Sequence, residues 1–137
     1  MMAEKDVRRP TDAELGILNV LWERGPSTVR EVHEALSSGR DTRYTTTLKL
    51  MQIMAEKGLV QRDESQRAHV YRAAKPRERT LAHLAADMLD RAFGGSAEKL
   101  LLHALQSKKV SAREIERIRK LLDDYESADN ARKEGRK

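Results

Sequence analysis

Apolar and polar residues repeat with the period of an α-helix in three segments of the amino-terminal half. The first follows the capping-box sequence Thr11-Asp-Ala-Glu14 and stops at Gly25-Pro26. The second follows another capping box, Thr28-Val-Arg-Glu31. The third runs from about Tyr44 to Lys57, and Gly58 is placed to end it in the left-handed conformation. The pattern predicts three consecutive helices.

The pattern then changes to that of strands. Leu59–Arg62 and His69–Arg72 are strand-like and flank the polar tip Asp63–Arg67, which predicts a β-hairpin. Three helices followed by a hairpin is the order of a winged helix-turn-helix domain. We expect a mainly α fold with a small β-hairpin wing, the DNA-binding domain covering residues 10–75.

The third predicted helix has two different faces. The face expected in the core carries Thr47, Leu50, Met51 and Met54. The opposite face carries Thr45, Lys49, Gln52 and Glu56, with Thr46 and Ile53 at its margins. The outward residues near its start are small, polar or basic, as required of a helix whose first turns meet phosphates and base edges in a DNA groove.

From Pro76 onward the pattern is helical again and predicts three further helices. The last opens with the capping box Ser111-Ala-Arg-Glu114, and its apolar residues follow coiled-coil-like spacing. Their stripes belong either to a core within one chain or to a seam between two chains. We favour the seam, because three short helices have little to bury against within one chain. The expected dimer interface comprises Leu101, Leu105, Ile115, Ile118, Leu122 and Tyr125. We therefore expect a helical dimerisation module at residues 76–126 and a flexible polar tail at 127–137.

Composition and charge agree with this organisation. The chain has 137 residues, 39% of them hydrophobic and 4% aromatic, which is little material for a large monomeric core. Its net charge of +5 favours an anionic partner. That charge is unevenly spread, since residues 1–39 have a balance of −2 and residues 40–75 a balance of +4.

The candidate DNA contacts lie in this basic segment. An exposed face with Lys49 and Gln52 would by itself be an ordinary solvated surface. The hairpin that follows and the local positive charge favour DNA contact instead. His69 is either a wing contact or a strand residue with no role. The candidate DNA-binding residues are Arg43, Thr45, Thr46, Lys49, Gln52, Arg67 and His69.

Other function classes find less support. The absence of cysteine excludes disulfides and thiolate metal sites, and His33, His83 and His103 are isolated, so we expect no metal and no cofactor. No catalytic triad, phosphate loop or nucleotide fingerprint is present, so we do not expect an enzyme. Without a signal peptide or a membrane-spanning run, we expect a cytoplasmic protein that is not inserted in a membrane. The alternative is a winged-helix module that binds protein and never DNA.

Several motifs in order resemble those of one family. They are Thr11-Asp-Ala-Glu-Leu15, Val20-Leu-Trp22, Gly25-Pro26, Thr28-Val-Arg-Glu-Val32, Tyr44-Thr-Thr46, Glu56-Lys-Gly58, Arg67-Ala-His-Val-Tyr71, Gly94-Gly95-Ser96 and Ser111-Ala-Arg-Glu-Ile115. The chain resembles the penicillinase repressor family, which includes methicillin-resistance and copper-transport repressors. The resemblance implies a homodimer that represses β-lactam-resistance-type genes from an inverted-repeat operator in double-stranded DNA.

The resemblance also bears on individual residues. It places recognition contacts on Thr45, Thr46 and Lys49. The chain departs from the family pattern at Ile53, where arginine is frequent, and at Lys49, where threonine is common, so its base preference is expected to differ. Copper sensing through thiolates is excluded, because the chain has no cysteine.

In penicillin-responsive relatives, a protease coupled to a membrane sensor cuts an Asn–Phe bond in the helix after the Gly-Gly turn. The matching bond here is His103-Ala104, so both side chains differ. The resemblance leaves two routes open for lifting repression. Either a cognate protease with a different pocket cuts at or near this bond, or a ligand releases the protein without a cut.

Overall fold

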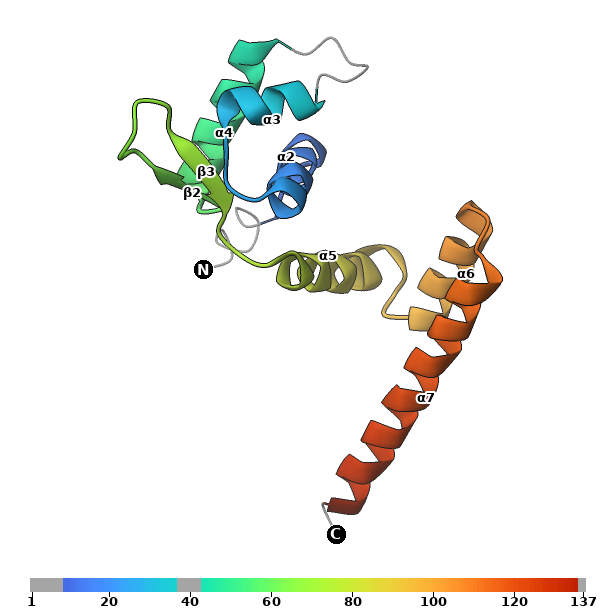
Figure 1. The fold of residues 1–137 in the computed structure, drawn as a ribbon. Helices are drawn as coiled ribbons and strands as arrows, with labels where there is room; N and C mark the ends of the chain where they lie inside the picture. Colours follow the sequence, from blue (N-terminus) through green and yellow to red (C-terminus); the bar gives the residue numbers. More distant parts are fainter. Residues whose placement is uncertain (1–8, 37–42, 136–137) are drawn as a thin grey trace. The chain divides into compact units, whose positions relative to one another are not determined.

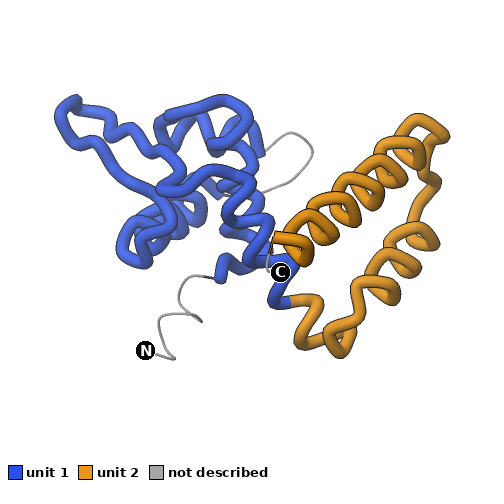
Figure 2. The backbone as a smooth tube through the Cα atoms, turned by 90° about the horizontal axis from the view of Figure 1, so that it is seen from below, with its two compact units in different colours: residues 1–87 blue, residues 88–137 orange. Residues whose placement is uncertain are grey.

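In the computed structural model, residues 9–36 and 43–135 are described, and they belong to two compact units. The first unit comprises residues 1–87 and the second residues 88–137 (Figure 2).

The described part of the first unit starts with three helices (Figure 1). They are α2 (Asp12–Arg24), α3 (Val29–Leu36) and α4 (Tyr44–Lys57), and the ends of α4 match the predicted ones. Both capping boxes predicted in this unit form: the amide of Glu14 donates to Oγ1 of Thr11, and that of Glu31 donates to Oγ1 of Thr28, each at 3.2 Å. Gly58 has a φ of 82° and ends α4 in the left-handed region.

The predicted hairpin is confirmed as β2 (Val60–Asp63) and β3 (Val70–Ala73), with Gln61 opposite Arg72 and Arg62 opposite Tyr71. A third strand, β1 (Ser27–Thr28), was not predicted. It pairs antiparallel with β3, so the sheet order is β1-β3-β2. A two-residue strand is too short to leave a periodic pattern in the sequence.

One hydrophobic core holds these elements together. It gathers residues from α2, α3, α4 and both hairpin strands, namely Ile17, Leu18, Leu21, Val29, Val32, Met51, Met54, Val60 and Tyr71. Burial of this apolar surface is the main source of the unit's stability. The winged helix-turn-helix domain expected from the sequence is therefore the observed fold.

Three more helices follow, as predicted: α5 (Arg77–Ala92), α6 (Ala97–Ser107) and α7 (Ala112–Gly135). Gly94 and Gly95 both have positive φ and form the turn after α5. None of the described residues in these three helices is buried. Large apolar side chains remain exposed, among them Leu121, Leu122 and Tyr125 at 68%, 58% and 69%.

Two features of the helical half were not predicted. The polar segment expected to be a flexible tail from Ser127 is helical as far as α7 extends, and only residues 136–137 of it lie outside the described part. Helix-forming residues and the pairs that Asp129 makes with Arg132 (2.8 Å) and Lys133 (3.3 Å) account for this. The two compact units divide after Asp87, within α5, whereas the expected DNA-binding domain ends at residue 75.

Candidate nucleic-acid interface

Helix α4 presents a polar, partly basic face to solvent. Its inner residues Thr47, Met51 and Met54 are buried in the core, whereas Thr45, Lys49 and Gln52 are exposed, as predicted. Arg43 precedes the helix as its N-cap residue and makes no side-chain capping bond, and the first turn contains no acidic residue. The positive end of the helix dipole therefore faces solvent next to a guanidinium group, an arrangement that attracts phosphate.

Side chains of α3 support the first turn of α4. Nδ1 of His33 lies 3.2 Å from Oγ1 of the buried Thr47, and its ring packs edge-on against Tyr44, with 5.6 Å between ring centroids. Tyr44 is 38% exposed, and the guanidinium carbon of Arg30 lies 5.4 Å from its ring centroid. These contacts hold an exposed cation beside the start of α4. Arg30 and Tyr44 are therefore candidate site residues that were not predicted.

A charged pair anchors the other end of α4. Nζ of Lys57 donates to Oε2 of Glu14 at 2.8 Å, and the amide of Thr11 donates to Oε1 at 2.9 Å. Burial, the largest influence, raises the pKa of Glu14, but the bonds and charge of Lys57 and the bonds from Thr11 outweigh it. The pKa of Glu14 therefore lies below its usual 4.5, and its carboxylate holds the last turn of α4 against α2.

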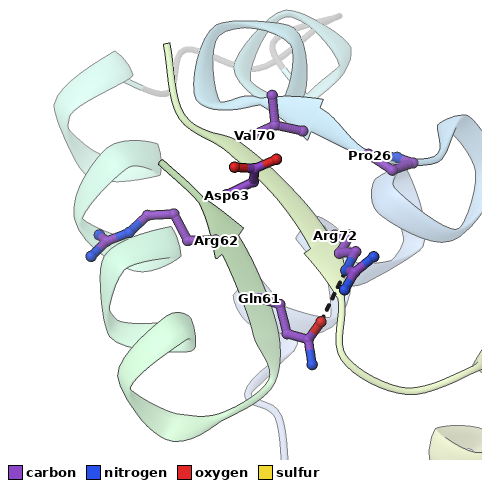
Figure 3. A pocket seen from close by; sticks show the side chains of 6 residues that line it. All are labelled: Pro26, Gln61, Arg62, Asp63, Val70 and Arg72. Atoms are coloured by element: carbon purple, nitrogen blue, oxygen red, sulfur yellow. Dashed lines mark hydrogen bonds between the residues drawn. The ribbon is translucent and has the colours of Figure 1, made fainter. Parts of the chain in front are cut away.

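The wing has one polar face and one inward face. Nε of Arg72 donates to Oε1 of Gln61 at 2.9 Å across the two strands. This pair lines an open cavity of about 430 Å³, with Asp63, Val70 and Pro26 on its walls (Figure 3). Arg62 extends toward the α4 side of the sheet, away from Arg72. Contacts with the Tyr71 hydroxyl and the Glu64 carboxylate raise the pKa of Arg62 further above its usual range and fix its position.

The predicted contacts occupy two parts of the first unit. Four of them are exposed on α4, namely Thr45, Thr46, Lys49 and Gln52, and Arg43 is exposed directly before the helix. Arg67 and His69 are exposed in the connection between the wing strands, and β2 packs on α4. No pattern in the sequence pointed to Arg30, because its contact with Tyr44 depends on how α3 packs on α4.

The described residues show neither a metal cluster nor a membrane-spanning helix. Among them, no group of three or more His, Asp or Glu side chains is placed to hold a metal ion. None of their helices is both long enough and apolar enough to cross a membrane.

Three helices and a wing, with a polar and basic face on the third helix, define a winged helix-turn-helix protein. The model of the penicillinase repressor family matches residues 10–124. The transcriptional regulator BlaI of Mycobacterium tuberculosis is 38% identical over 118 residues, covering 85% of this chain and 84% of that protein. Penicillinase repressors of Staphylococcus aureus and Bacillus licheniformis are each 22% identical over 123 residues, covering 90% of this chain and 97% and 96% of theirs. The chain belongs to the penicillinase repressor family.

Proposed function

We propose that the chain is a sequence-specific DNA-binding transcriptional repressor that inserts α4 into the major groove. The observation that carries this proposal is the exposed face of α4, where Thr45, Lys49 and Gln52 can meet base edges. Lys49 is suited to the O6 and N7 acceptors of guanine, and Gln52 to adenine. Arg43 and Arg30 lie at the start of the helix for phosphate contact, and Arg67 serves the wing in the same way.

A homodimer is part of the proposal. Leu105, Ile115, Leu122 and Tyr125 of the expected interface are exposed, and Leu101 and Ile118 are half-buried. Apolar side chains repeated on helices with no buried residue are suited to a second copy of the same module. A two-fold dimer would read an inverted repeat whose half-sites lie about 34–36 Å apart, or a multiple of that distance. Such a repressor acts where the chromosome is, so cytoplasmic placement belongs to the same proposal.

The names of the relatives suggest which genes are repressed. We propose genes of the β-lactam-resistance type as targets and a membrane sensor-protease as the upstream partner. The candidate bond His103-Ala104 lies within α6, and both side chains are exposed. The ring of His103 lies 5.8 Å from that of Phe93. A protease binding an extended substrate would first have to unfold this part of α6.

The deciding experiment measures DNA binding against salt. The full-length chain selects duplexes from a random pool, and fluorescence anisotropy then follows binding by wild type and by Lys49→Ala and Arg67→Ala variants. Lys49→Ala should change the preferred bases, with about 1–3 kcal/mol lost at one position of the site. Arg67→Ala should weaken all sequences alike and lower the salt slope by about one. Lys99→Ala, which removes an exposed lysine from α6, is the matched control and should change neither property.

Unchanged binding by both test variants would place the DNA surface elsewhere. Wild-type protein that binds no duplex, or whose affinity does not fall with salt, would favour the protein-binding winged-helix module instead.

A further inference from the structure

Trp22 of α2 ties the DNA-binding unit to the start of α5. Its Nε1 donates to the carbonyl oxygen of Lys75 at 3.0 Å, directly before Pro76 and the first residue of the helix. The guanidinium carbon of Arg77, in the first turn of α5, lies 5.6 Å from the centroid of the indole ring. One side chain of α2 therefore holds both the strand-to-helix connection and the first turn that follows.

A second contact lies near the other end of α5. Nη1 of Arg9, two residues before the N-cap Thr11 of α2, lies 2.7 Å from Oδ2 of Asp87. Residues 77 and 87 are about 15 Å apart along a helix axis. The two contacts thus hold α5 at two separated points, one beside each end of α2, and two points fix the direction of a rod.

Helix α5 continues without interruption from this attachment into the second unit, which begins at Met88. We propose that Trp22, Arg77 and the Arg9–Asp87 pair form a latch that sets the direction of α5 on the DNA-binding unit. In a dimer joined through residues 88–135, that direction determines how far apart the two α4 helices lie. The latch residues therefore determine which half-site spacing is read, without touching DNA. This inference rests on the proposed function.

The physical reason is the stiffness of the connection. A firmly held helix places each α4 correctly for one spacing and must be bent or detached for any other. A loosened helix lets the two DNA-binding units of the dimer adapt to several half-site spacings. The affinity for the preferred spacing then falls, because pre-organisation is lost.

The test uses the full-length chain and two kinds of duplex. One contains a single half-site, and the other set contains inverted repeats whose spacing increases one base pair at a time. Trp22→Phe combined with Arg9→Ala removes the indole donor and the ion pair but keeps a ring against the core and Arg77. The matched control is Arg79→Ala, which removes an exposed cation from the same helix.

We expect the latch variant to bind the half-site within about twofold of wild type, while the ratio between its best and worst spacing falls at least about threefold. The control should keep the wild-type ratio. A second variant, Arg77→Ala with Arg9→Ala, keeps the only tryptophan of the chain, whose emission reports whether the unit remains folded.

An unchanged ratio in folded variants that still bind the half-site would overturn the proposal. If the variants lost half-site binding while the wild type kept it, the proposal would also be overturned. The contacts would then stabilise the DNA-binding unit without setting the direction of α5. Wild-type protein that binds no half-site would instead refute the proposed function.

Discussion

Replacing Lys57 by methionine tests how α4 is held in place. The substitution keeps a long side chain with good helix propensity but leaves the carboxylate of Glu14 without its cationic partner. Glu14 is 2% exposed, and the side chain of Lys57 is 31% exposed. Removing one partner of a fully buried pair costs about 3–5 kcal/mol, and exposed pairs contribute about 0–1 kcal/mol. For this pair at the edge of the core, we expect a loss of about 2 kcal/mol from a typical total of about 5–15 kcal/mol.

The pH dependence gives the sharper test. In the wild type, the folded-state pKa of Glu14 lies below 4.5, so its contribution is present above that pH and is lost as the pH falls through the folded pKa. In the variant, burial is no longer outweighed by Lys57, and the pKa of Glu14 should rise above its unfolded value. The difference in unfolding free energy between wild type and variant should therefore be largest near neutral pH and shrink on acidification.

Urea unfolding, followed by the emission of Trp22, measures this difference at about pH 7 and about pH 4. The control is the double variant Glu14→Gln, Lys57→Met, which removes the uncompensated charge and should be more stable at neutral pH than Lys57→Met alone. A loss at neutral pH below about 0.5 kcal/mol, or one that does not shrink on acidification, would refute this account of the pair.

Three further predictions address function. Replacing Ile118 and Leu122 together by glutamate should give monomers in analytical ultracentrifugation, and a fully dimeric variant would show that the seam lies elsewhere. Arg30→Ala should lower the salt slope of DNA binding by about one, while Tyr44→Phe, which keeps the ring beneath Arg30, should leave it unchanged. If the salt slope of Arg30→Ala were also unchanged, Arg30 would not contact DNA. If a sensor-coupled protease lifts repression, immunoblots after β-lactam exposure of the host should show a fragment ending near His103, whereas induction with the full-length protein intact would exclude cleavage.

The first unit could be predicted from the sequence because its signals are local. Capping boxes at Thr11 and Thr28, the glycine at 58 and the two faces of the third helix each determine structure within a few residues. Contacts between distant segments gave no such signal. The ring of Tyr44 meets Arg30 only because α3 crosses α4, and β1 exists only because β3 lies beside it.

The helical half was predictable in its elements but not in their limits. The residues after Tyr125 contain no apolar repeat, which favoured an irregular tail, yet intrinsic propensity and charge pairs such as Asp129–Arg132 continue the helix. The division of the compact units within α5, after Asp87, was not predicted either. Arg9 precedes all the predicted elements, and its pairing with Asp87 depends on the folded arrangement of the first unit.

The DNA-binding unit has its own core, whereas α5, α6 and α7 have no buried residue. This contrast has a consequence for gene dosage. Formation of the proposed dimer through the helical module depends on the number of chains in the cell. Where dimers are in the minority, halving the protein reduces the dimer roughly fourfold by mass action. During growth without new synthesis of the protein, occupancy of the operator would then fall faster than the concentration of the chain. Expression of the repressed genes would therefore rise steeply even before any inducer acts.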